Sequence, residues 1–158
     1  EEKTNVMRTL EQKKIAYTAH TYPHEEGMAV DGVTVAKSMG FDPAIVFKTL
    51  VARGASKQYY VFDVPVAENL DLKKAAKAVG EKSIEMIHQK ELLPLTGYVH
   101  GGCSPVGMKK LFPTVFHETA ENLETMIVSA GKIGYQVELA PRDLAALVRA
   151  KFADIIVE

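Results

Sequence analysis

The sequence has a single cysteine, Cys103, among its 158 residues. One cysteine excludes an internal disulfide, and the lack of a disulfide framework favours a reducing compartment. No apolar run approaches the roughly 18 residues that a membrane-spanning helix needs. The first residues, 1–5, are acidic and lack the cationic start of a signal peptide. We therefore expect a cytoplasmic protein with no membrane partner.

The sequence also lacks the residue spacings of a metal site. Its five histidines show no ligand pattern, and Cys103 has no second cysteine beside it. We therefore expect no metal and no cofactor. Cys103 follows His100 closely enough to suggest a nucleophile and its base, but a small buried cysteine is the commoner alternative.

Charge of one sign is not in excess, since the net charge is −1 with 25% charged residues. Residues 71–110 carry seven Lys and Arg against four Asp and Glu, and residues 111–158 carry four against seven. A basic middle segment could meet nucleic-acid phosphates, although a solvated face is the simpler interpretation. With 47% apolar residues, residues 1–158 are expected to form one domain with a proper core.

Apolar periodicity, caps and turn residues predict short helices and strands mixed along the chain. Helices or helical turns are predicted after Thr4 and at 33–39, 42–45, 72–79, 89–93 and 142–149. Strands are predicted at 15–22, 46–51, 58–63, 83–86, 97–100, 114–117, 125–129 and 135–139. This irregular order favours an α/β (α+β) domain with a mixed sheet of six to seven strands, curled or barrel-like and flanked by helices.

Lys48 is the first candidate for chemistry because the strand around it is apolar. In an alternating strand it shares a face with Val46 and Leu50. A lysine there either extends its amine to water at a sheet edge or lines a cavity. In a cavity, desolvation would lower its pKa and suit it to act beside a carbonyl or a phosphate.

The second candidate is the glycine-rich segment 97–107. Glycines such as Gly101 and Gly102 allow the main chain to approach a ligand, and consecutive N–H groups can form an anion or oxyanion site. Pro105 would stiffen the segment. It is not a phosphate-binding P-loop, because Met108-Lys109 stands where Lys-Ser/Thr is required. A tight structural connection is the alternative.

Several segments together resemble one family. They are Phe47-Lys48-Thr49-Leu50, Val64-Pro65-Val66-Ala67, Asp71-Leu72-Lys73-Lys74, Thr96-Gly97-Tyr98, Gly101-Gly102-Cys103-Ser104-Pro105-Val106-Gly107, Val128-Ser129-Ala130-Gly131-Lys132 and Ala150-Lys151-Phe152-Ala153-Asp154-Ile155. In this order they resemble the YbaK proteins, bacterial Cys-tRNA(Pro) deacylases related to the editing domain inserted in prolyl-tRNA synthetase. The likeness covers nearly the whole chain.

This resemblance implies trans-editing of cysteine mischarged onto tRNA(Pro), a near-isostere that a synthetase pocket cannot reject by binding alone. The family's essential lysine falls on Lys48, and its Gly-x-x-x-Pro loop falls on Gly101 to Pro105. Its pocket tyrosine, threonine and serine fall on Tyr22, Thr49 and Ser129. The implied mechanism is attack by the substrate's own thiol on its carbonyl, which needs no enzyme nucleophile or metal.

The chain also departs from the family. Gln136 replaces an acidic residue and belongs to the expected substrate-binding set, while Ile133 replaces a frequent arginine. A pocket aromatic is replaced near Val30 or Asp31. An Ala-tRNA(Pro) deacylase and a non-catalytic module that binds tRNA or a synthetase therefore stay open. The expected partners are aminoacyl-tRNA and prolyl-tRNA synthetase in a ternary complex.

Overall fold

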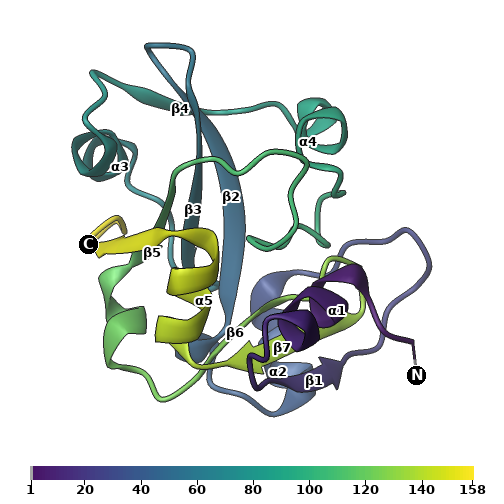
Figure 1. Cartoon of the computed structure of the whole chain (residues 1–158). Coiled ribbons are helices and arrows are strands. Elements are labelled where there is room, and N and C mark those ends of the chain that lie inside the picture. Colours follow the sequence, from purple (N-terminus) through teal and green to yellow (C-terminus); the bar gives the residue numbers. More distant parts are fainter. Residues whose placement is uncertain (1) are drawn as a thin grey trace.

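The computed structural model describes residues 2–158 and arranges them as two small sheets with helices around them (Figure 1). One sheet has three antiparallel strands in the order β1-β7-β6. Its strands are β1 (Thr18–Thr21), β7 (Tyr135–Leu139) and β6 (Met126–Ser129). β1 is mostly exposed and β6 is buried throughout, so this sheet leads from the surface into the core.

The second sheet has five strands in the order β4-β2-β3-β5-β8. β2 (Phe47–Gly54) and β3 (Tyr59–Pro65) form the antiparallel hairpin that the turn residues at 53–57 predict. β3 and β5 run parallel, as do β5 and β8, so the sheet is mixed. The remaining strands are β4 (Ile84–Met86), β5 (Thr114–His117) and β8 (Ala150–Ala153).

The two sheets meet at one end of β2. A parallel bridge joins Val46 to Ile127 of β6, and β4 pairs with β2 only from Ala52 onward. Between these two points, residues 47–51 have β3 on one side and no strand of the described chain on the other. The fold therefore leaves an open edge in the middle of β2.

Two helices cover opposite faces of the β2–β3 hairpin. α3 (Leu72–Val79) buries Ala75 and Ala76 against the face that carries Phe62. On the other side lie α4 (Gln89–Thr96) and the segment that follows it. Figure 1 shows these two helices on either side of the long hairpin. Both faces of the hairpin are thus inside the molecule, which explains why β3 is apolar along nearly its whole length.

The largest core lies between α1 (Asn5–Gln12), α5 (Pro141–Val148) and strands of both sheets. α1 begins at Thr4, whose hydroxyl accepts the N–H of Met7, as its sequence position predicts. Leu10 of α1 and Leu144 of α5 are both fully buried in this core. Two helices distant in sequence thereby hold the two sheets together.

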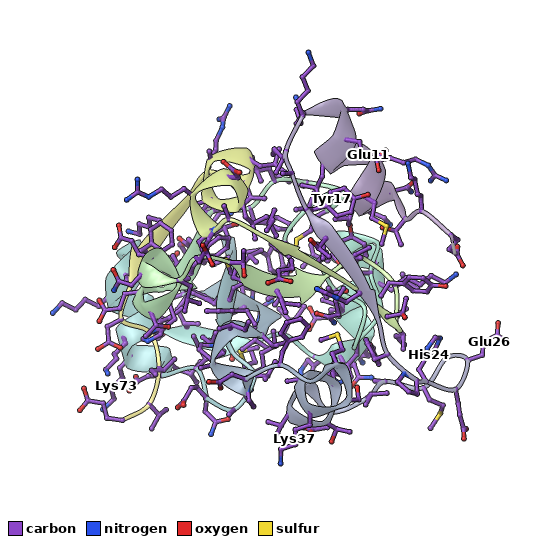
Figure 2. The ribbon with its side chains drawn as sticks, turned by 90° about the horizontal axis from the view of Figure 1, so that it is seen from below. Glu11, Tyr17, His24, Glu26, Lys37 and Lys73 are labelled. Carbon is purple, nitrogen blue, oxygen red and sulfur yellow. The ribbon has the colours of Figure 1, made fainter. Side chains whose placement is uncertain are left out.

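The remaining short elements lie at the surface. They are α2 (Gly32–Met39) and the 3-10 turns η1 (Pro43–Ile45) and η2 (Glu118–Asn122). Lys37 of α2 and Lys73 of α3 point away from the body of the molecule, while Glu11 and Tyr17 point toward each other (Figure 2). The Tyr17 hydroxyl donates to the Glu11 carboxylate at 2.6 Å. No helix among residues 2–158 has the length and apolar composition needed to cross a membrane.

The fold class is confirmed, but some predicted elements are wrong. The structure has eight strands in two sheets, where one sheet of six to seven was expected. Residues 97–100 are not a strand, because Gly97 adopts φ 89° as the C-cap of α4 and the chain then turns. α4 continues to Thr96, beyond the predicted end at 93. The edge strand β8 was not predicted.

Candidate active site

A cavity of about 410 Å³ opens at the unpaired edge of β2. Its walls come from β2, the segment before α2, the glycine-rich segment and the ends of β6 and β7. The lining residues are Tyr22, Ala29, Val30, Asp31, Gly32, Val35, Val46, Phe47, Lys48, Thr49, Leu50, Val66, Leu92, His100, Gly101, Cys103, Ser129 and Gln136. An apolar hollow with a few polar groups converging on it is the usual form of a ligand site.

Lys48 lines this cavity and is only partly exposed. Burial lowers the pKa of its ammonium, because desolvation disfavours the charged form. The carboxylates of Asp31 and Glu68 act in the opposite direction, but more weakly. Of the two alternatives for this lysine, the structure has the cavity-lining one.

Thr49, beside Lys48, lines the same cavity, and its side chain makes a hydrogen bond to a buried residue. Its hydroxyl donates to Oδ1 of Asp63, which lies directly opposite on β3. Asp63 is 0% exposed, and burial raises the pKa of its carboxyl to about 7 even though the hydrogen bond from Thr49 lowers it. An acid that titrates near neutral pH therefore lies directly behind a cavity residue.

Gly101 places the main chain at the cavity wall opposite β2. Its φ is 89°, a left-handed conformation that favours glycine. A Cβ added there would lie 2.7 Å from the Cβ of Ala29, so the two backbone segments touch only because the side chain is missing. The glycine is required both by its conformation and by this close approach.

The three-stranded sheet supplies the third wall. Ser129 and Gln136 are register partners on β6 and β7, and each is 7% exposed. Ser129 Oγ accepts the N–H of Gly131, while Gln136 Oε1 is buried with no hydrogen-bond partner in residues 2–158. Tyr22 continues the wall after β1 and is 4% exposed. Gln136 is thus left with an unpaired acceptor at the cavity.

Cys103 also lines the cavity, together with His100. Burial, with a smaller contribution from the charge of Asp63, raises the pKa of the Cys103 thiol to about 12. A thiol with this pKa is protonated at neutral pH and is a poor nucleophile. The small-buried-cysteine interpretation therefore fits better than a Cys103–His100 nucleophile and base.

Two predicted site residues do not face the cavity, and these expectations need correction. The N–H of Gly102 donates to the carbonyl of Val99 at 3.0 Å, so it does not point at a ligand. Pro105 lies in a separate hollow of about 150 Å³ on the other side of the glycine-rich segment. Both residues lie away from the cavity for one reason. Residues 97–107 form a series of turns, where an extended strand end was expected.

Sequence reasoning also missed Asp63. A lone carboxylate in the apolar strand 59–65 was a usable signal, comparable with the one that identified Lys48. What it bonds to was not readable, because Thr49 meets it only through the strand register. In the described part of the chain, no three His, Cys, Asp or Glu side chains are grouped as metal ligands.

A second cleft of about 410 Å³ lies between the start of α1 and residues 130–132. Two of its four cations form ion pairs, since Lys132 pairs with Glu2 at 2.6 Å and Lys3 pairs with Glu11 at 2.9 Å. These exposed pairs are worth little energetically, and none shows the burial seen at Lys48. The cavity at β2 is therefore the better candidate.

Comparisons with known proteins identify the family of the chain. A family model described as "Aminoacyl-tRNA editing domain" matches residues 24–147. The "Putative Cys-tRNA(Pro)/Cys-tRNA(Cys) deacylase EbsC" of Enterococcus faecalis is 45% identical over 155 residues, covering 98% of this chain and 94% of that protein.

Two solved structures are similar over nearly the whole chain. One is described as "a putative trans-editing enzyme for prolyl tRNA synthetase", with a TM-score of 0.81 and 25% identity, covering 97% of this chain and 95% of that one. The other is a hypothetical protein with a TM-score of 0.84 and 19% identity, covering 96% and 99%. The second likeness shows the fold alone.

Proposed function

Since the chain belongs to the aminoacyl-tRNA editing domain family, we propose that it is a trans-editing deacylase that removes cysteine from mischarged Cys-tRNA(Pro), with Cys-tRNA(Cys) as a second substrate. The family membership confirms the resemblance that the sequence motifs indicate. Residues 1–158 form one editing domain in this proposal. The observation that carries it is the cavity at β2, in which Lys48, Thr49, Gly101 and Ser129 converge.

The lining residues have distinct roles in the proposed reaction. The Lys48 ammonium orients the aminoacyl group or the terminal phosphate of the tRNA. The main-chain N–H of Gly101 holds the carbonyl oxygen as negative charge develops on it. Thr49 and Ser129 bond the terminal ribose, and the buried side chains of Tyr22 and Gln136 shape the wall around the amino acid.

The substrate supplies the nucleophile. Its thiol sulfur attacks its own carbonyl carbon, the ester bond to the ribose oxygen breaks, and the thiol proton ends on that oxygen. The products are tRNA and a cysteine thiolactone. Because an aminoacyl ester is already activated, positioning and charge stabilisation suffice. A Cys103 thiol that stays protonated fits a site in which the enzyme provides no nucleophile.

We place this reaction in the cytoplasm, in a ternary complex with tRNA and prolyl-tRNA synthetase. The basic excess at residues 71–110 is available to neutralise phosphates. Copurification of the synthetase only when Cys-tRNA(Pro) is present would support this arrangement.

A panel of tRNA(Pro) charged with Cys, Ser, Ala or Pro tests the proposed function. Only the cysteinyl ester has a thiol, so we expect it to be deacylated at least about 100-fold faster than the seryl ester of nearly the same shape. The measurement is multiple-turnover loss of each radiolabelled amino acid, with thiolactone identified by mass spectrometry.

The same panel separates the competing functions. Fast loss of alanine would favour an Ala-tRNA(Pro) deacylase, whose substrate has no thiol. Binding of charged tRNA without turnover would favour a non-catalytic module. Release of free cysteine with no thiolactone at early times would contradict the thiol-assisted step while leaving deacylation in place.

Gly101→Ala is expected to lower deacylation about tenfold, because the added Cβ displaces Ala29 and the cavity wall with it. The matched control is Gly40→Ala. Gly40 has φ 78° and nothing within 4 Å of a Cβ, so it suffers the same backbone strain of about 1 kcal/mol without a clash. Equal losses of deacylation rate in the two variants would show that strain alone explains the effect.

A further inference from the structure

Asp63 is a buried acid that the proposed reaction does not use. It is 0% exposed, and its Oδ2 has no hydrogen-bond partner in residues 2–158. Its Oδ1 accepts one hydrogen bond, from the Thr49 hydroxyl. Burying a carboxyl with so few partners costs free energy, which suggests that the carboxyl has a role in function.

Asp63 reaches the cavity only through its neighbours. It is absent from the lining, whereas Thr49 on the adjacent strand and Cys103 in the glycine-rich segment are both part of it. The strand register fixes Thr49 directly opposite Asp63. Any effect of Asp63 on a ligand must therefore pass through the groups that separate it from the cavity, and Thr49 is the one to which it is hydrogen-bonded.

A threonine hydroxyl has one hydrogen and two lone pairs. Because the hydrogen of Thr49 is directed inward to Asp63, Oγ1 can offer only lone pairs to the cavity. We propose that Asp63 is a positioning residue that sets the direction of the Thr49 hydroxyl, so that Thr49 accepts a hydrogen bond from a donor group of the ligand.

This inference rests on the proposed function and narrows the ligand contact. The end of an aminoacyl-tRNA offers two kinds of donor, the free ribose hydroxyl and the α-ammonium, while the ester carbonyl is an acceptor. Thr49 in this orientation binds a donor and does not hold the carbonyl oxygen. The oxyanion contacts are then left to Lys48 and the backbone of Gly101.

The orientation depends on pH. Burial raises the pKa of Asp63 to about 7, so the carboxyl changes charge across the neutral range. Cys103, the titratable residue of the covering segment that interacts with the charge of Asp63, stays neutral there because burial raises the pKa of its thiol to about 12. The neighbours across the strands, Thr49 and Phe116, do not titrate.

Each protonation state of Asp63 gives a different cavity wall. The ionised carboxylate can only accept, so it holds the Thr49 hydrogen inward and makes Oγ1 a stronger acceptor. The protonated acid can donate to Thr49, which frees the Thr49 hydrogen to turn toward the cavity. A ligand donor is therefore bound better above neutral pH than below it.

The test compares wild type with Asp63→Asn over pH 5.5 to 8.5, using kcat/KM for Cys-tRNA(Pro). The amide oxygen still accepts from Thr49 but never carries charge. The ratio of wild type to variant should rise about tenfold from the acid end to the alkaline end. Ionisations of the substrate cancel in this ratio. A ratio that does not change with pH would overturn the proposal, because a purely structural role has no titration.

Two further measurements isolate Thr49. In a Thr49→Val background, Asp63→Asn should leave the pH profile unchanged, whereas a Thr49→Ser background should restore the rise. Independently of catalysis, Thr49→Val should raise the pKa of the Asp63 carboxyl in a ¹³C NMR titration, because the hydrogen bond that lowers it is lost. An unshifted titration would overturn the inference even in an active enzyme. Absence of deacylation with a shifted titration would instead reject only the proposed function.

Discussion

Lys48→Ala is expected to lower kcat/KM for Cys-tRNA(Pro) deacylation by at least about 100-fold, the effect typical of removing one charge-stabilising group from an active site. Lys48 contributes a partly buried ammonium to the cavity, and burial outweighs the attraction of Asp31 and Glu68 in its pKa. In a cavity shielded from water such a charge acts more strongly on a developing oxyanion or a phosphate than it would at the surface.

The matched control is Lys37→Ala, which removes a lysine that points away from the body of the molecule (Figure 2). It should keep the wild-type rate. A fall in kcat for Lys48→Ala at unchanged KM would indicate that the ammonium acts in the transition state, whereas a rise in KM alone would indicate that it orients the bound substrate. Wild-type kinetics for Lys48→Ala would remove the proposed site.

The pH dependence gives a second check on the same residue. The ammonium is charged below its pKa, and burial moves that pKa downward. The contribution of Lys48 should therefore decline at a lower pH than that of an exposed lysine. The ratio of wild type to Lys48→Ala, measured from pH 7 upward, reports this decline after subtraction of spontaneous ester hydrolysis.

Much of the fold was predictable because its signals are local. Thr4 caps α1, and Gly40 and Gly80 end α2 and α3 in left-handed conformations, at the places that their sequence neighbours indicate. The β2–β3 hairpin likewise follows from its turn residues. Such features depend on a few consecutive residues and not on the rest of the chain.

The errors lie where distant segments decide the outcome. β8 is an edge strand whose residues are only partly buried, and it exists because β5 lies beside it. The two sheets are joined by a parallel bridge between Val46 and Ile127, which are 81 positions apart in the sequence. Neither feature has a periodic signal of its own in the sequence.

The site divides in the same way. Lys48 was identified because a charge in an apolar strand is visible locally. Gly102 and Pro105 were placed wrongly because the direction of an N–H or a ring in a glycine-rich segment depends on each successive turn. The pairing of Thr49 with Asp63 was invisible because it needs the register of two strands.

Asp63→Asn is expected to be more stable than wild type at alkaline pH. Its advantage in the free energy of unfolding should be roughly 4 kcal/mol larger at pH 8 than at pH 4. Burial raises the carboxyl pKa from 3.8 to about 7 in the folded chain. Well below pH 3.8 the acid is protonated in both the folded and the unfolded chain and costs nothing by this route. As pH rises toward 7 only the unfolded chain ionises, so wild-type stability falls by about 1.4 kcal/mol per pH unit, and above pH 7 the loss is complete.

Urea denaturation of wild type and Asp63→Asn between pH 4 and 8.5 measures this difference. Glu124→Gln, which removes an exposed carboxylate, is the control and should show no comparable growth with pH. A constant gap between wild type and Asp63→Asn would mean that the carboxyl titrates normally inside the protein. The same result would mean that the direction of the Thr49 hydroxyl does not change with pH in the neutral range.

The stability gain and the proposed loss of activity in Asp63→Asn arise from the same ionisation. Both require a negative charge that is held inside the protein with Thr49 as its hydrogen-bond donor. At alkaline pH the variant should therefore be more stable and less active than wild type. At acid pH its stability should be close to that of wild type, and its activity deficit should be gone. A loss of stability and a gain of activity over the same pH range are expected of a residue that is kept in an unfavourable state for function.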